Sequence, residues 1–116
     1  MDLKFQNELI NLLYIALGSV PGALIRWSLQ NDLIANILGV AVLGFSIGLS
    51  LNQRLRLLIA IGFCGSLTTF SGWIIATMEI FLKGEYWEAL VKIALTFLLG
   101  FFVLVIGLYL GRKISS

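Results

Sequence analysis

The sequence predicts an all-α integral membrane protein with four transmembrane helices, from its composition and from its four apolar runs. Of its 116 residues, 59% are hydrophobic and 12% are charged, and the mean hydropathy is +1.01. Soluble domains carry about a quarter charged residues. A helix needs about 20 apolar residues to cross the hydrocarbon of a bilayer. We therefore expect a single four-helix transmembrane domain, residues 1–116, with membrane lipid around it.

The apolar runs predict where the helices lie. We expect helices at residues 9–29, 33–51, 57–82 and 86–110. Only short polar segments separate them, so consecutive helices must run antiparallel, and four crossings place both chain ends on one side. The first run continues past any small-residue cleavage site of a signal peptide, so we interpret it as a retained helix.

The rarest residue types exclude several kinds of site. Cys64 is the only cysteine and there is no histidine. An intrachain disulfide, a zinc site and histidine-based catalysis are therefore excluded. No nucleophile with a plausible base lies at membrane depth, so we expect no enzyme. We also expect no nucleic-acid partner.

Glycines recur at a spacing that brings transmembrane helices close together. Three Gly-x-x-x-Gly pairs occur, one in each of the first, second and fourth runs: Gly18 and Gly22, Gly44 and Gly48, and Gly107 and Gly111. Such glycines are frequent in membrane helices whatever the function. Ordinary helix packing is therefore the favoured interpretation of each pair.

The third run has an unusual centre. Residues 62–73 combine three glycines with four hydroxyl side chains. One interpretation is a break in the helix between Gly62 and Gly72, since exposed backbone at membrane depth is tolerated inside protein or beside water, where its carbonyls can coordinate an ion. The other is a glycine-rich packing face whose hydroxyls bond to their own helix. Composition alone leaves both open.

Three segments of the chain resemble one known family. Residues 62–71, Gly-Phe-Cys-Gly-Ser-Leu-Thr-Thr-Phe-Ser, resemble the signature of the CrcB/Fluc fluoride channels. Residues 18–27 are similar to the family's first-helix pattern Gly-x-x-x-Gly-Ala-x-x-Arg-aromatic, and residues 36–39 to its second-helix Asn-x-x-Gly. The third-helix string is long and unusual, and together the three segments make the resemblance specific.

The resemblance implies a passive fluoride channel that exports fluoride from the cytoplasm across the inner (plasma) membrane. It implies a dimer of two antiparallel subunits with two fluoride pathways. It also implies a structural sodium ion at the centre of the interface, held by backbone carbonyls. The matching positions here are Gly65 and Thr68. Two carbonyls from each subunit would give four hard oxygen ligands, which suit a hard cation.

The resemblance also indicates which residues line the ion pathway. Asn36 would supply amide N–H donors, and Thr69 or Ser71 hydroxyl donors. Phe70 would turn the positive edge of its ring toward an anion. Arg26 matches a family arginine that would concentrate anions in an aqueous vestibule; the alternative is an arginine that extends to the membrane interface.

The chain departs from the family pattern at three positions. Trp73 stands where a second phenylalanine is usual, and we expect it to line the pathway as a larger ring with an added N–H donor. Ala76 stands where a glutamate is common, and Lys92 where a tyrosine is usual. Thr96 matches the family's track of hydroxyls on the fourth helix; the alternative is a hydroxyl bonded to its own helix.

Two further alternatives concern the class of protein and its subunit partner. A small multidrug-resistance transporter has a similar length, but it needs a carboxylate deep in the first helix. The only acid in the first helix here is Glu8, at its edge.

The membrane side that holds both termini carries five basic residues: Lys4, Arg54, Arg56, Arg112 and Lys113. The other side carries three: Arg26, Lys83 and Lys92. This small excess favours a dual-topology antiparallel homodimer, with half of a heterodimer, its termini cytoplasmic, as the alternative.

Overall fold

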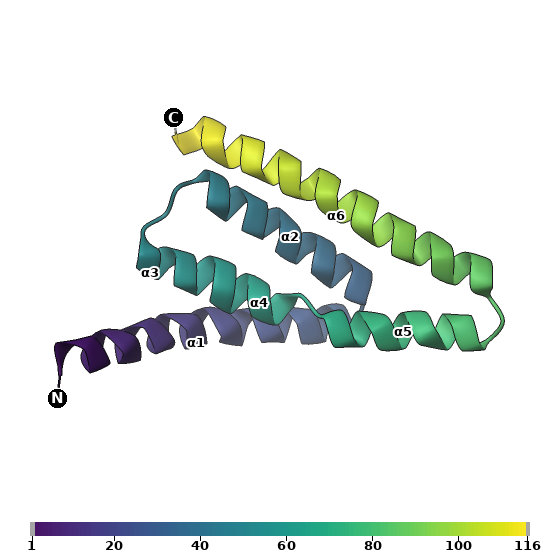
Figure 1. Cartoon of the computed structure of the whole chain (residues 1–116), viewed down its shortest axis with the longest axis horizontal. Helices are drawn as coiled ribbons and strands as arrows, with labels where there is room; N and C mark the ends of the chain where they lie inside the picture. Colours follow the sequence, from purple (N-terminus) through teal and green to yellow (C-terminus); the bar gives the residue numbers. More distant parts are fainter. Residues whose placement is uncertain (1, 116) are drawn as a thin grey trace.

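The structure, a computed structural model, describes residues 2–115, and helices make up nearly all of this range (Figure 1). In chain order the helices are α1 (Leu3–Leu29), α2 (Asp32–Gly48), α3 (Gln53–Arg56), the π-helix η1 (Leu57–Phe63), α4 (Cys64–Leu67), α5 (Phe70–Leu82) and α6 (Tyr86–Ser115). The all-α prediction is confirmed for the described residues.

The third apolar run is broken near its middle. α3, η1 and α4 follow one another as one helical rod that ends at Leu67. Thr68 and Thr69 then take extended backbone conformations, with ψ of 151° and 120°, and α5 begins at Phe70. The predicted interruption between Gly62 and Gly72 is therefore confirmed, and the alternative of a continuous glycine-rich helix is wrong.

Three helical runs within the described residues are long and apolar enough to cross a bilayer: Leu3–Leu29, Gln53–Leu82 and Tyr86–Ser115. The remaining apolar helix, α2, has 17 residues. That is the lower limit of the range of about 17 to 25 residues for a spanning helix. The structure thus has three long apolar helices and a shorter one, as a multi-pass membrane protein requires.

Several helix ends differ from the prediction. α2 ends at Gly48 rather than at residue 51, because Ser50 takes a left-handed conformation with φ of 56°. α1 begins at Leu3 rather than at residue 9, since the Asp2 side chain accepts a hydrogen bond from the Lys4 N–H (2.7 Å) and caps the helix. α6 continues past residue 110 to Ser115.

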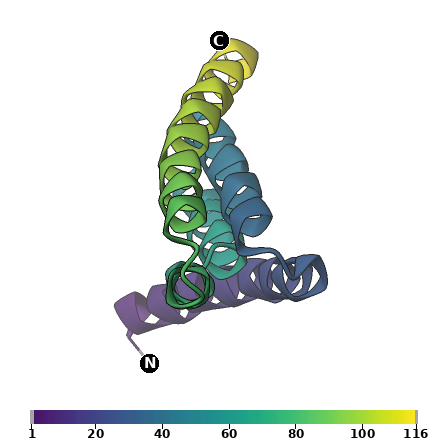
Figure 2. The same ribbon diagram turned by 90° about the vertical axis from the view of Figure 1, so that its right-hand side faces the viewer.

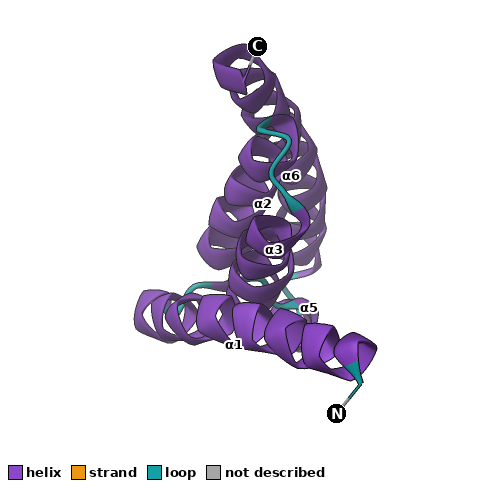
Figure 3. Ribbon diagram, turned by 90° about the vertical axis from the view of Figure 1, so that its left-hand side faces the viewer, coloured by secondary structure: helices purple, strands orange, loops and turns teal. Residues whose placement is uncertain are grey.

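The helices form a stack with the third run in its middle. Figure 1 shows α6 beside α2, then α3 and α4, and α1 beyond them. Figures 2 and 3 show the same order from the two sides, with α1 lying across the stack. The start of α1 and the end of α6 lie at the same end of the molecule (Figure 1), as four antiparallel segments require.

Glycines allow α2 and α6 to touch through their backbones. A Cβ added at Gly44 would overlap the Leu104 carbonyl oxygen, and one at Gly107 would overlap the Ala41 carbonyl oxygen. The pair at Gly48 and Gly111 is equally close. On the other side of the stack, a Cβ at Gly18 or Gly22 of α1 would overlap the backbone of η1. All three Gly-x-x-x-Gly pairs therefore pack helices, as predicted.

Few side chains are buried in the chain itself. Among the described residues, the buried apolar side chains are Ala35, Cys64, Leu67, Trp73 and Ala89. Large apolar side chains are exposed along α1, α5 and α6. Soluble monomers rarely expose apolar patches of more than a few hundred Å². The outer surface is therefore suited to lipid.

Candidate functional site

The break between α4 and α5 is held by a side chain of α2. The Thr69 N–H donates to Asn36 Oδ1 (2.7 Å), and Asn36 Nδ2 donates to the Thr69 carbonyl oxygen (3.1 Å). The Asn36 amide therefore takes the place of the helical partners that the N–H and the carbonyl of Thr69 would have in a continuous helix. We call this pair of hydrogen bonds the Asn36 staple. It satisfies backbone groups that would otherwise be costly at membrane depth.

Two backbone carbonyls lose their helical donors at this break. In a continuous helix, the Thr69 N–H would donate to the Gly65 carbonyl and the Gly72 N–H to the Thr68 carbonyl. Here the Thr69 N–H donates to Asn36 Oδ1, and the Gly72 N–H donates to Thr69 Oγ1 (3.1 Å). Gly65 is exposed, with open space where a side chain would be. The family resemblance described above implies these same two carbonyls as sodium ligands.

The first residues of α5 combine a buried hydroxyl with an exposed ring. Thr69 caps the helix and is 7% exposed, so its hydroxyl lies inside the structure. Phe70 is 71% exposed, and Ser71 beside it is also exposed. The proposed pathway residues of this segment therefore lie both at the break and on the outer surface of the chain.

Trp73 and Thr96 join α5 to α6. The indole Nε1 donates to Thr96 Oγ1 (3.0 Å), and the Thr96 hydroxyl donates to the Lys92 carbonyl oxygen (2.7 Å). The Trp73 ring, which is 8% exposed, contacts Phe97 edge to face with ring centroids 6.1 Å apart. The alternative given for Thr96, a hydroxyl bonded to its own helix, is confirmed, and its place on the ion pathway stays a prediction. The sequence did not indicate its second partner, Trp73.

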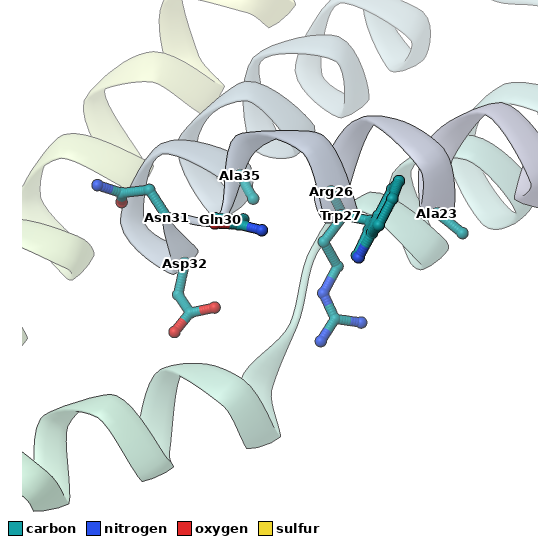
Figure 4. Close-up of a pocket in the computed structure, with 7 residues that line it drawn as sticks. All are labelled: Ala23, Arg26, Trp27, Gln30, Asn31, Asp32 and Ala35. Atoms are coloured by element: carbon teal, nitrogen blue, oxygen red, sulfur yellow. The ribbon is translucent and has the colours of Figure 1, made fainter.

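A pocket with charged and amide side chains in its lining opens at the turn between α1 and α2 (Figure 4). Its volume is about 350 Å³. It is lined by Ala23, Arg26, Trp27, Gln30, Asn31, Asp32 and Ala35. The Arg26 and Asp32 side chains extend to the same side of the turn (Figure 4). Arg26 thus lies on an open hollow at the end of α1.

Comparison with known proteins identifies the family. The family model described as "CrcB-like protein, Camphor Resistance (CrcB)" matches residues 13–108, which is most of the chain. The chain belongs to the CrcB family. This match covers the break, the Asn36 staple and the pocket of Arg26, and it confirms the resemblance seen in the sequence.

Individual members of the CrcB family are similar over nearly the whole chain. Fluoride-specific ion channel FluC 2 of Synechococcus sp. (strain CC9605) is 45% identical, with 95% of this chain and 87% of that protein covered. Fluoride-specific ion channel FluC 2 of Prochlorococcus marinus (strain MIT 9313) is 43% identical, with 90% and 85% covered. Fluoride-specific ion channel FluC of Sulfurihydrogenibium sp. (strain YO3AOP1) is 36% identical, with 88% and 97% covered.

These relatives bear on the class of the protein. They are named as ion channels, so the prediction that this CrcB-family chain is not an enzyme is confirmed. With its apolar helices, the chain is a multi-pass membrane protein.

Asp32 is a residue near the break of this CrcB-family chain that the sequence patterns did not indicate. The carboxylate lies beside the start of α5, since a Cβ added at Gly72 would be 3.1 Å from Asp32 Oδ1. Asp32 stands four residues before Asn36 and therefore on the same face of α2. The four-residue spacing between Asp32 and Asn36 is the feature of the sequence that places both on one helix face. Asp32 also belongs to the polar group of residues 30–32, which is typical of a turn between two helices.

Proposed function

We propose that the chain forms a passive, fluoride-selective ion channel of the inner (plasma) membrane that exports fluoride from the cytoplasm. The observation that carries this proposal is the broken third run, held by the Asn36 staple, in a CrcB-family chain. The relatives described above are named as fluoride-specific channels. A membrane potential that is negative inside drives an anion outward, so no energy source is needed.

Hydrogen-bond donors for fluoride remain available beside the staple. An asparagine amide carries two N–H donors, and only one of those of Asn36 donates to Thr69. The Thr69 oxygen accepts from the Gly72 N–H, which leaves the hydroxyl proton for another acceptor. Ser71 is exposed and adds a second hydroxyl. These groups can replace part of the hydration shell of a small anion.

Phe70 supports a pathway that runs between two subunits. Its ring is 71% exposed on the outside of the chain, one residue beyond the break. The edge of an aromatic ring is electropositive and attracts an anion. A second, antiparallel copy that covers this surface would enclose Phe70 and Ser71. Arg26, in its open pocket, would raise the local anion concentration at one end of the pathway.

The donor set at the break fits a sodium ion. The Gly65 and Thr68 carbonyls have lost their helical donors, and Gly65 lies on the exposed surface. Carbonyl oxygens are hard ligands that suit a hard cation. When bound, sodium would supply positive charge that holds the carbonyls of two subunits together. The residues of this chain contribute by keeping both carbonyls free, through the Asn36 staple and the Thr69 cap.

A second assignment, half of a heterodimeric fluoride channel, is favoured by one observation. Trp73 fills the family position of a pore phenylalanine, and its indole donates to Thr96, the matched member of the hydroxyl track. One pathway of such a chain would be obstructed while a partner subunit supplies the other. Labelling of Ser116→Cys from outside intact cells separates the cases; Ser116 lies outside the described residues. Labelling of about half the molecules supports dual topology, and complete protection supports a fixed subunit with cytoplasmic termini.

Growth on fluoride tests the proposed function in cells. A bacterial strain that lacks its own fluoride exporter is expected to grow on fluoride when this chain is expressed. The matched control is Asn36→Asp, which changes one side-chain group and puts a negative charge beside the break. Equal sensitivity of the empty strain and of the strain that expresses the parent chain in its membrane would contradict the proposal.

A further inference from the structure

The Asp32 carboxylate lies beside the start of α5 and has not been given a role so far. Asp32 is the first residue of α2, and its Oδ1 lies beside Gly72 at the start of α5. A Cβ on Gly72 would be 3.1 Å from Asp32 Oδ1 and 3.1 Å from Thr69 Oγ1. The absence of a side chain at Gly72 therefore leaves room for the carboxylate.

Asp32 also lines the open pocket of Arg26 (Figure 4). Asn36 follows on the next turn of the same face of α2 and holds the break. Asp32 thus lines the pocket and stands one helical turn before the residue that forms the staple. On a route from the pocket to the staple, an anion would pass the carboxylate.

The charge of Asp32 is not balanced by a direct partner. Its side chain is half-buried, and within residues 2–115 it makes no hydrogen bond or ion pair. Arg26 is the cationic residue in the lining of the same pocket. A half-buried negative charge repels an approaching anion more strongly than one in bulk water, because the surrounding dielectric constant is lower.

We propose that Asp32 limits the rate at which anions enter the pathway of this subunit from the pocket. This inference rests on the proposed function and concerns a residue outside the sequence patterns that suggested that function. The carboxylate opposes the attraction of Arg26, and its removal leaves the Arg26 charge unopposed. Asp32 is therefore a rate-determining residue for fluoride entry, and its effect depends on charge rather than on side-chain volume.

Fluoride efflux from liposomes that contain the purified protein tests this inference. Asp32→Asn removes the charge with almost no change in shape, and Asp32→Ser gives a second, smaller neutral residue and leaves the helix cap at Asn31 in place. Asp32→Glu keeps the charge. Glu85→Gln is the matched control, because it removes one exposed carboxylate that does not line the pocket.

The inference predicts that both neutral variants increase fluoride efflux, by roughly tenfold for a charge that governs ion entry. Asp32→Glu and Glu85→Gln are expected to match the parent, and chloride efflux is expected to stay low in all five proteins. Unchanged or slower efflux from both neutral variants would overturn the inference, while selective flux from the parent would leave the proposed function standing. An equal increase in chloride efflux would indicate a leak and would also overturn it. No flux from any of the proteins would overturn both the inference and the proposed function.

Discussion

Asn36 and Thr69 hold each other by two hydrogen bonds across 33 residues of sequence. The Thr69 N–H donates to Asn36 Oδ1 at 2.7 Å, and Asn36 Nδ2 donates back to the Thr69 carbonyl at 3.1 Å. One side-chain amide thus stabilises the break and releases the Gly65 carbonyl, and only one of its two N–H groups donates to Thr69. Structure and proposed function meet at this residue.

Asn36→Asp is expected to abolish fluoride flux. The substitution removes the amide N–H that donates to the Thr69 carbonyl oxygen. It also places a negative charge where the anion would pass. Leaving the buried Thr69 carbonyl without its donor costs about 1 to 3 kcal/mol of folding free energy. Flux is measured by fluoride efflux, and folding by size-exclusion elution in detergent. A folded Asn36→Asp protein that conducts as well as the parent would show that Asn36 does not contact the ion.

The bond between Trp73 and Thr96 is expected to stabilise the contact of α5 with α6. Trp73→Phe and Thr96→Val each remove it and should lower the free energy of unfolding by about 1 kcal/mol from the lost hydrogen bond. The double variant is expected to lose less than the sum of the two, because the second substitution has no bond left to break. Reversible unfolding in detergent measures all three. Strictly additive losses would mean that the two side chains do not interact.

Gly107 and Gly100 lie on the same helix, α6, and should respond to alanine in opposite ways. A Cβ at Gly107 would lie 2.8 Å from the Ala41 carbonyl oxygen, whereas one at Gly100 would lie 4.0 Å from the Ile37 side chain. Gly107→Ala should therefore destabilise the protein by about 1 to 3 kcal/mol through overpacking. Gly100→Ala should be neutral or stabilising by up to about 1 kcal/mol, because alanine favours helix. Equal melting temperatures of the two variants would contradict the close approach of α2 and α6.

Removal of sodium is expected to weaken the proposed dimer. The Gly65 and Thr68 carbonyls have no helical donors, so without a cation their partial charges repel one another across an interface. Exchange of sodium for a bulky organic cation should lower the dimer fraction seen by cross-linking in detergent, and return of sodium should restore it. Potassium at equal ionic strength is the control for screening. A dimer fraction that does not respond to sodium would exclude the proposed site.

Much of the fold could be predicted from composition and periodicity alone. Four apolar runs separated by short polar turns allow little besides antiparallel helices, and the glycine and hydroxyl content of residues 62–73 indicated a break. The ends of the helices were less predictable. Leu49 and Leu51 are apolar, yet the left-handed backbone at Ser50 ends α2 before them. Nothing in residues 57–63 distinguishes the π-helix from an α-helix.

The site was predictable where residues act alone and less so where they act in pairs. Asn36 and Thr69 were each indicated by the sequence, but as donors to an ion and not as partners of each other. The bond from Trp73 to Thr96 joins two helices, and the approach of Asp32 to Gly72 joins segments that are 40 residues apart. Such contacts depend on how helices stack, which a single sequence with many equivalent apolar faces does not determine.

Ion efflux from liposomes tests the central claim most directly. Purified protein is reconstituted into liposomes loaded with either fluoride or chloride, and efflux is followed with an ion-selective electrode after a potassium ionophore is added. Rapid release of fluoride with retention of chloride is the result that a fluoride-selective channel predicts, with protein-free liposomes as the control. Equal release of both ions, or retention of both by liposomes that contain folded protein, would contradict it.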